Sequence, residues 1–173
     1  MITGSCAVVG LCMALALSWM EPAVHDVQMT VLDVGHGQSI LLQWNGNAFL
    51  IDCGGDRDTQ AADLAAQTLL SQGTNHLDGL ILTHTDYDHA GGAEYLLQRM
   101  SVDRVILPES PGSDCLSGEA VPPMEAVCFQ ADGGKLTVFG PIWAEGGNEN
   151  SLCVLFESEK CAILITGDRG VFG

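Results

Sequence analysis

The segment from His84 to His89 constrains this chain most, because it places four side chains that can bind metal within six residues. Two imidazoles, from His84 and His89, flank the carboxylates of Asp86 and Asp88, directly after an apolar run at residues 79–83. Such a cluster is costly unless a cation neutralises and orders it. A loop that leaves a strand can turn several side chains towards one point. The pattern therefore indicates a metal-binding loop at the end of a strand.

A solvated loop between a strand and a helix is the alternative interpretation, because Asp and His are ordinary in polar loops. The residues that follow favour metal binding. Gly91 and Gly92 let the backbone pass close to a bound ion. Residues 93–99 then have the pattern of a helix, whose first turn would present backbone N–H groups to an anionic substrate.

The composition indicates one folded domain, or one domain with an anchor. Of the 173 residues, 47% are hydrophobic, which is enough for a core. The net charge is −16, because 22 acidic residues outweigh 6 basic ones, and such a surface repels nucleic acid. Divalent ions held by part of these carboxylates would supply positive charge where a phosphate docks.

The first 22 residues differ from the rest of the chain. Ile2 to Met20 is a mostly apolar run without charged side chains, about 28 Å long as a helix. A signal peptide and a buried helix are the alternatives. The first has no basic residue to support it, and Trp19 to Pro22 makes a poor cleavage site. We therefore predict a transmembrane or membrane-anchor segment at 1–22 and a folded domain at 26–173. The absence of nearby Lys and Arg leaves the orientation open.

Apolar alternation predicts strands first, strand–helix units in the middle and strands again at the end. We expect two mixed sheets packed face to face with helices outside. The predicted strands are 27–34, 39–44, 48–52, 79–83, 102–107, 126–130, 135–139, 151–157 and 161–166; a hairpin turn spans 45–47; the helices are 59–72 and 93–99; and a loop spans 108–123.

Two further carboxylates stand at the ends of apolar strands. Asp52 closes a strand just before Gly54 and Gly55, and Asp168 follows the apolar run at residues 163–165 and a Thr-Gly pair. Either aspartate alone would be interpreted as a turn residue. Together with the loop at residues 84–89, however, they repeat one arrangement three times. We therefore expect all three strand ends to meet at one edge of the domain.

These motifs, in this order, resemble the metallo-β-lactamase superfamily. They are Leu50-Ile51-Asp52-Cys53-Gly54, then His84-x-Asp86-x-Asp88-His89-x-Gly91-Gly92, then Thr166-Gly167-Asp168. The stretch from Leu32 to Ser39, the Asp inside the metal loop and the pair Asn150-Ser151 narrow the resemblance to the soluble C-terminal domain of ComEC-family DNA-internalisation proteins. The resemblance covers residues 27 to 168, nearly all of the predicted folded domain.

The resemblance implies an α/β fold, a four-layer αββα metallo-β-lactamase-like sandwich with a metal centre at one edge. In the ComEC family this domain follows a membrane region, which fits the apolar segment at 1–22. The superfamily places another His beyond the Thr-Gly-Asp strand, whereas this chain stops at Gly173. We therefore interpret the domain as truncated at its C-terminus, with weaker metal binding or lost activity as a consequence.

By the family pattern, His84 and Asp86 would serve one metal site, Asp88 and His89 the other, and Asp168 would bridge them. Asp88 would also act in catalysis, by orienting the attacking water or accepting its proton. Carboxylate-rich ligation leaves the two divalent ions open between zinc and manganese. Asn150 and Ser151 stand where many relatives have a further His ligand. The residues predicted to order or line the site without being its main ligands are Asp33, His36, Asp52, Asn150 and Ser151.

The function that the resemblance implies is metal-dependent hydrolysis of DNA phosphodiester bonds during uptake for natural transformation. DNA, the membrane and the competence DNA-uptake machinery would be the partners, and the domain would lie outside the cytoplasm on a membrane anchor. Two alternatives stay open. One is a hydrolase of the same fold that acts on a small ester, thioester or lactam, which the net charge favours. The other is a non-catalytic sandwich that supports a membrane channel.

Overall fold

A computed structural model describes residues 8–16, 27–109, 116–142 and 150–169, with the side chain of residue 58 left out. Residues 8–16 form a helix. The other helices are α2 (Asp58–Ser71), α3 (Tyr87–Ala90) and α4 (Ala93–Arg99). The strands are β1 (Val27–Val31), β2 (Ile40–Trp44), β3 (Asn47–Ile51), β4 (His76–Leu77), β5 (Gly79–Ile81), β6 (Ser101–Val102), β7 (Val105–Pro108), β8 (Glu119–Val121), β9 (Ala126–Ala131), β10 (Gly134–Phe139), β11 (Cys153–Glu157) and β12 (Ala162–Ile165).

Two sheets make up the β structure, in the orders β1-β2-β3-β5-β7-β8 and β12-β11-β10-β9, beside a short β4-β6 pair. In the larger sheet, β1 to β3 are antiparallel and β5, β7 and β8 join them in parallel. The predicted hairpin turn between β2 and β3 is confirmed. Asn45 and Gly46 have φ angles of 44° and 83°, the left-handed pair that a two-residue hairpin requires.

The larger sheet separates two hydrophobic cores, and strand periodicity divides its side chains between them. In β3, Ala48 and Leu50 pack with α2 and α4, whereas Phe49 and Ile51 face the smaller sheet. The Trp44 and Phe49 rings stack with centroids 5.0 Å apart between the sheets. Burial of one large apolar side chain contributes about 1.5–3 kcal/mol, so both faces of this sheet stabilise the fold.

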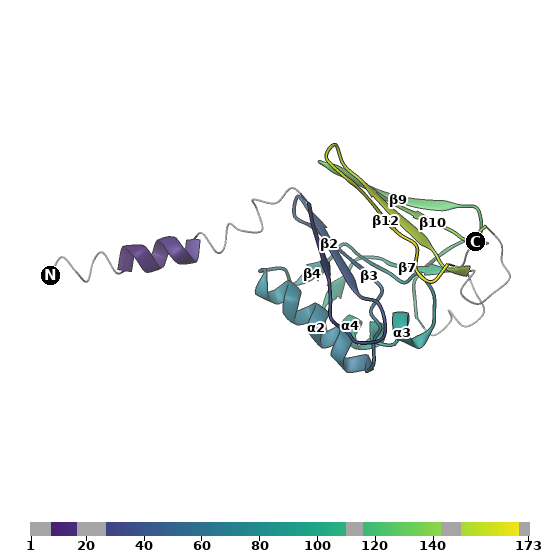
Figure 1. Cartoon of the computed structure of the whole chain (residues 1–173), viewed down its shortest axis with the longest axis horizontal. Coiled ribbons are helices and arrows are strands. Elements are labelled where there is room, and N and C mark those ends of the chain that lie inside the picture. Colours follow the sequence, from purple (N-terminus) through teal and green to yellow (C-terminus); the bar gives the residue numbers. More distant parts are fainter. Residues whose placement is uncertain (1–7, 17–26, 110–115, 143–149, 170–173) are drawn as a thin grey trace.

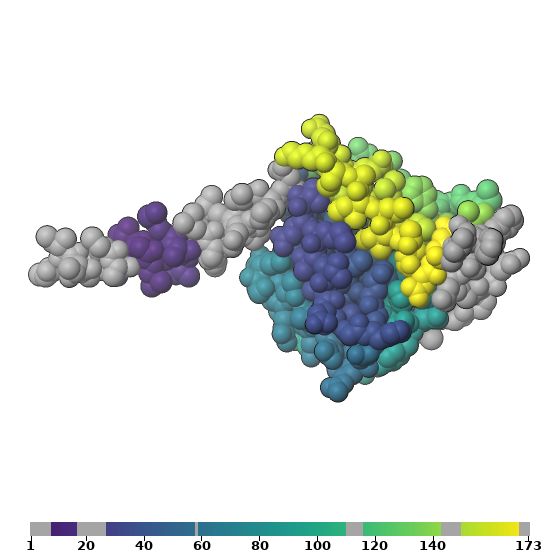
Figure 2. Space-filling view, in the orientation of Figure 1, coloured from purple at the N-terminus to yellow at the C-terminus, as the bar shows by residue number. Residues whose placement is uncertain are grey.

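The layers are helix, sheet and sheet. Helices α2 and α4 lie on one side of the larger sheet, and β9 to β12 cover the other side (Figure 1). Figure 2 shows the yellow segment of β11 and β12 seated beside the dark-blue N-terminal strands. From β9 to β12 the described residues contain no α-helix, so three of the four predicted layers are present in the described part of the chain.

Some element boundaries differ from the prediction. Residues 108–123 were predicted as a loop, yet Glu119–Val121 form β8, which pairs with β7 as an edge strand. Pro and Gly in that stretch conceal a strand only three residues long. The first strand ends at Val31, not at residue 34, and α2 begins after Arg57, not after Thr59. Both boundaries adjoin loops of the metal centre: one loop follows β1, and the other precedes α2.

The predicted membrane segment is only partly described. Residues 8–16 are helical, and their apolar side chains are exposed, Val8 and Leu11 each by 63%. The remaining residues of the 1–22 segment lie outside the described ranges. Within those ranges, no helix has the length and apolar character needed to cross a bilayer. The prediction of a membrane anchor is therefore not confirmed.

Candidate metal centre

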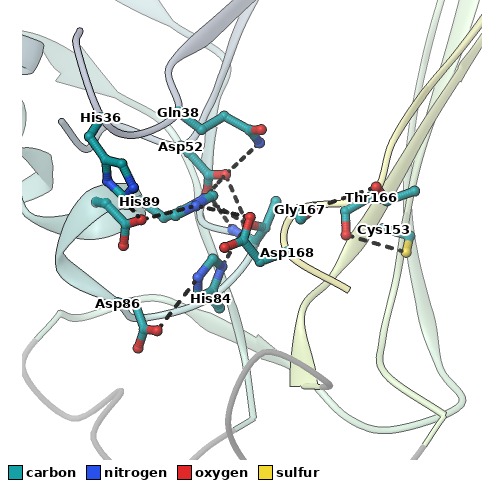
Figure 3. Close-up of polar contacts among 12 residues, drawn as sticks. His36, Gln38, Asp52, His84, Asp86, His89, Cys153, Thr166, Gly167 and Asp168 are labelled. Carbon is teal, nitrogen blue, oxygen red and sulfur yellow. Dashed lines mark hydrogen bonds and ion pairs between the residues drawn. The ribbon is translucent and has the colours of Figure 1, made fainter. Parts of the chain in front are cut away.

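Three strand ends meet at one edge of the sheets, as the sequence predicted (Figure 3). Asp52 follows β3, the loop from His84 to His89 follows β5, and Asp168 follows β12. His89 links all three, because its Nδ1 lies 2.9 Å from Asp52 Oδ2 and its Nε2 lies 3.4 Å from Asp168 Oδ1. Asp168 thus reaches one of the two histidines, His89.

The buried floor of this cluster consists of Asp52, Thr83 and the two imidazoles. His84 and His89 are 4% and 3% exposed, and their ring centroids lie 4.0 Å apart. His84 Nε2 is buried and has no hydrogen-bond partner among the residues that the structure describes. One ligand atom each from His84, Asp88 and His89 lies within 4.8 Å of the others. A buried, unpaired nitrogen is costly, so this position has the character of a site that a ligand completes.

Asp52 supports the two imidazoles from the buried side of the cluster. Its carboxylate is fully buried and accepts four hydrogen bonds, from Thr83 N (2.6 Å), Thr83 Oγ1 (2.8 Å), Gln38 Nε2 (2.8 Å) and His89 Nδ1 (2.9 Å). Its backbone has φ 59°, a conformation that Asp tolerates better than most residues. This geometry matches the predicted supporting place of Asp52 beside the imidazoles.

Backbone hydrogen bonds hold the loops together. Gln38 N donates to Asp88 O at 3.0 Å, and Cys53 N donates to His89 O at 2.7 Å. A Cβ at Gly54 would overlap the backbone of Asp88 and His89. The glycine therefore permits a close approach that fixes the metal-binding loop against the end of β3.

Sequence reasoning missed Thr83 and Gln38. Thr83 was assigned to a strand, and Gln38 entered only as part of the stretch at residues 32–39 that narrows the resemblance, yet both side chains bond to Asp52. The available signal was the burial expected at the end of an apolar strand. A hydroxyl placed there, directly before His84, needs an acceptor.

Three carboxylates form the rim of the cluster. Asp86 Oδ2 lies 3.8 Å from His84 Nε2, Asp88 Oδ2 lies 3.9 Å from His89 Nε2, and Asp168 Oδ1 lies 3.4 Å from His89 Nε2. Their side chains are 60%, 30% and 44% exposed, respectively. The predicted pairs, His84 with Asp86 and Asp88 with His89, are thus each in contact, while Asp88 also groups with His84.

The pKa values of the two histidines are shifted in opposite directions. Burial lowers the pKa of His84, and the neighbouring His89 adds to this effect. Burial acts in the same direction on His89, but the hydrogen bond to Asp52 and the charges of Asp52, Asp168 and Asp88 outweigh it and raise the pKa of His89. Burial and the Asp52 charge raise the pKa of the Cys53 thiol to about 12, so Cys53 offers no thiolate at neutral pH.

The remaining predicted residues lie at different distances from the cluster. His36 is exposed, with Nδ1 3.7 Å from Asp88 Oδ2 on the outer side of the rim. Ser151 is buried and adjoins Gly167, and Asn150 Nδ2 donates to Glu109 O at 3.3 Å. Asp33 is exposed and forms no hydrogen bond or ion pair with the described residues. A rim position for Asp33 thus has no polar contact to support it.

The donor set fits divalent cations. Unpaired imidazole nitrogen and carboxylate oxygen are ligands for zinc and manganese. The other nitrogen of each imidazole, Nδ1, faces an oxygen of the protein, as is usual for histidines that bind metal. The cluster therefore has the chemistry and the supporting contacts of a metal site.

Comparison with known proteins agrees with this geometry. Recombination protein 2 of Haemophilus influenzae is 29% identical over 150 residues, which cover 82% of this chain and 18% of that protein. ComE operon protein 3 of Bacillus subtilis is 30% identical over 125 residues, 63% of this chain and 16% of that protein. The predicted resemblance to ComEC-family proteins is confirmed, and the chain spans less than a fifth of each relative.

The fold is shared with solved structures. A metallo-β-lactamase with a HARLDQ motif from Cronobacter sakazakii superposes with a TM-score of 0.56 at 17% identity, over 80% of this chain and 60% of that one. The family model for the metallo-β-lactamase superfamily matches residues 32–170, which include Asp52, His84 to His89 and Asp168. The chain belongs to the metallo-β-lactamase superfamily.

Proposed function

We propose that this domain hydrolyses phosphodiester bonds of DNA with the help of two divalent ions, zinc or manganese, during DNA uptake. The observation that carries the hydrolytic part is the meeting of Asp52, the His84–His89 loop and Asp168 at one edge. The substrate is supported by similarity to proteins named for recombination and for the ComE operon. The competence DNA-uptake machinery would then be the partner.

In this proposal, each side chain has one task. His84 and His89 would hold the ions through Nε2, with Asp86, Asp88 and Asp168 completing the ligand set. Divalent ions, when bound, lower the pKa of water and neutralise charge on a phosphodiester. Asp88 would accept the proton of the attacking water, because its carboxylate is partly exposed and lies beside His89 Nε2. Asp52 would remain on the buried side of the rings as a hydrogen-bond acceptor.

The test is cleavage of single- and double-stranded DNA by the purified domain with Zn²⁺ or Mn²⁺, with and without a chelator. Asp88→Ala should reduce the rate by about a hundredfold or more, because it removes both a ligand and the base. Asp132→Ala, at an exposed turn between β9 and β10, is the matched control and should cleave as the wild type does. Equal rates for Asp88→Ala and the wild type would refute the proposed mechanism.

A small-molecule hydrolase is the second candidate, and the net charge of −16 favours it. A polyanion must approach a surface with 22 acidic and 6 basic residues, whereas a neutral ester, thioester or lactam meets no such repulsion. A panel of such substrates, assayed beside DNA with the same metal-loaded protein, separates the two. Absence of stoichiometric metal after purification with metal present would instead favour a non-catalytic sandwich.

We also propose that residues 1–22 attach the domain to a membrane, with the domain outside the cytoplasm. The support is the apolar sequence of this segment and the exposure of the apolar side chains at residues 8–16. Fractionation of cells that express the chain with and without residues 1–22 tests the attachment. Recovery of both forms in the same soluble fraction would contradict it.

A further inference from the structure

The Thr83 hydroxyl lies between the supporting carboxylate and the two histidines. Thr83 is fully buried, and its Oγ1 is 2.8 Å from Asp52 Oδ2 and 3.1 Å from His84 Nδ1. His89 Nδ1 is farther away, at 3.5 Å, and bonds to Asp52 directly at 2.9 Å. His84 forms no direct hydrogen bond or ion pair with Asp52, so Thr83 is its connection to that carboxylate.

The single hydroxyl proton decides the direction of these bonds. A carboxylate only accepts hydrogen bonds, and it is a stronger acceptor than a neutral imidazole nitrogen. The Thr83 proton therefore points to Asp52, and the lone pairs of Oγ1 face His84. Nδ1 of His84 must then carry a proton, because two lone pairs would otherwise face each other at 3.1 Å in a buried place. In a neutral His84, Nε2 is consequently bare, which means that it carries no proton and its lone pair is free.

The same reasoning applies to His89 by a shorter route. Asp52 Oδ2 accepts from His89 Nδ1, so Nε2 of a neutral His89 is bare as well. Both bare nitrogens then face the rim, where Asp86 lies beside His84 and Asp168 beside His89. One carboxylate thus sets the tautomers of two imidazoles, one directly and one through a hydroxyl.

Burial prevents a water molecule from taking the place of the Thr83 hydroxyl. Thr83 and Asp52 are both fully buried, and Gly167 packs against the Thr83 side chain, where any added Cβ would come within 2.8 Å of Oγ1. The backbone of Thr83 is held separately, because its N donates to Asp52 Oδ1 and its O accepts from Leu152 N. The hydroxyl can therefore be removed while the backbone contacts remain.

We propose that Thr83 is a positioning residue for the metal centre, whose hydroxyl relays the Asp52 acceptor to His84 and holds His84 in the Nδ1–H tautomer with Nε2 free to bind a divalent ion. The inference rests on the metal centre of the proposed function, and it is independent of which substrate is cleaved. It assigns Thr83 a role in metal affinity that packing alone would not give.

The experiment compares Thr83→Val, which replaces the hydroxyl with a methyl group of similar size, with Thr83→Ser, which retains the hydroxyl. Zn²⁺ affinity is measured by titration calorimetry in the presence of a competing chelator. Supporting contacts of metal-binding histidines are worth about tenfold to a hundredfold in affinity, so we expect that loss in Thr83→Val and less than about threefold in Thr83→Ser. Gln38→Leu removes a 2.8 Å bond to the same Asp52 oxygen without touching His84, so it is the matched control for the His84 tautomer and not for affinity.

The tautomer is read directly by long-range ¹⁵N–¹H NMR of the metal-free protein, at a pH above the range in which histidine titrates. Wild type, Thr83→Ser and Gln38→Leu should show His84 protonated at Nδ1, and Thr83→Val should show a mixture. A wild-type His84 protonated at Nε2 overturns the relay even if Thr83→Val does not fold. Unchanged affinity and tautomer in a folded Thr83→Val overturn it as well.

The outcomes separate the relay from the proposed function. A wild-type protein that binds Zn²⁺ but does not cleave DNA contradicts the substrate while leaving the relay supported by the affinities. A wild-type protein that binds no Zn²⁺ contradicts the metal centre, and the NMR signature of His84 still decides whether Thr83 sets its tautomer.

Discussion

The floor and the rim of the candidate metal centre are built differently. In the floor, Asp52, Thr83, His84 and His89 are buried, and hydrogen bonds of 2.6–3.1 Å connect them within the protein. In the rim, Asp86, Asp88 and Asp168 are partly exposed and lie 3.4–3.9 Å from the imidazoles, beyond hydrogen-bond length in most cases. Folding alone completes the floor, whereas a cation would complete the rim.

This difference separates stability from metal affinity. Changes in the floor should destabilise the fold and weaken metal binding together, because buried donors lose an acceptor. Changes in the rim should weaken metal binding alone, because water solvates an exposed carboxylate or its amide replacement equally well. The variants below test whether the two regions are as independent as their burial indicates.

Asp52→Asn should have the largest effect. The amide retains the left-handed backbone that Asn tolerates, but it removes the charge that four donors share. We expect a loss of about 2–4 kcal/mol in the free energy of unfolding of the metal-free protein, measured by urea denaturation. Metal affinity should fall as well.

Asp86→Asn is the control for Asp52→Asn, because it makes the same chemical change in a side chain that is 60% exposed. It should change the free energy of unfolding by less than about 0.5 kcal/mol. Equal destabilisation by the two variants would mean that burial does not distinguish floor from rim.

Asp168→Asn should have the next largest effect, and on metal affinity only. Its Oδ1 lies 3.4 Å from His89 Nε2, and Gly167, with φ 57°, turns the chain so that it reaches this position. We expect Zn²⁺ affinity to fall about tenfold to a hundredfold in calorimetry, with the urea midpoint of the metal-free protein unchanged. A matching loss of stability without metal would assign Asp168 to the floor.

The local sequence pattern predicted which strand ends carry the floor and rim residues, but not the hydrogen bonds that connect them. Asp52, His84 to His89 and Asp168 were identified because each stands where an apolar strand stops, and strand ends on one edge must meet. The bonds from Thr83 and Gln38 to Asp52 join residues that are 31 and 14 positions from it, and no periodicity encodes such contacts. They depend on the exact stacking of loops, which Gly54 permits.

The fold shows the same limit. The continuous apolar run at residues 48–51 and the Asn45-Gly46 turn predicted a strand and a hairpin, and the structure buries that strand on both faces. The three-residue β8 could not be predicted, because a strand that short carries no alternation and gains its stability from pairing with β7. The apolar pattern predicted two sheets with helices outside, and the family resemblance implied four layers; the described residues contain three of them.

Metal affinity should also depend on pH through His89. The pKa of His89 is raised in the metal-free protein, so its proton must leave before Nε2 can bind an ion. Affinity is then lowest at low pH, rises about tenfold per pH unit towards the folded pKa of His89, and levels off above it. The lowered pKa of His84 keeps that ring neutral above 6.5, so His84 adds no slope there.

Calorimetry in buffers of different ionisation enthalpy measures this dependence as protons released per ion. We expect release from His89 to persist above the ordinary histidine pKa of 6.5 and then to cease. Asp132→Ala, at the exposed turn between β9 and β10, should leave the profile unchanged. Affinity that is already constant at pH 6.5 would contradict the raised pKa of His89.

His36→Ala should have the smallest effect, although His36 was predicted at the site. Its side chain is 86% exposed, and its only ion pair with the described residues is a 3.7 Å contact with Asp88 Oδ2 from the solvent side. Exposed pairs of this kind contribute about 0–1 kcal/mol, so Zn²⁺ affinity should change by less than about threefold. The backbone bond from His36 N to Asp56 Oδ1 survives the substitution, so the loop should keep its place. A tenfold or greater loss of affinity would instead show that His36 binds the ion, and the rim would then include an imidazole as well as carboxylates.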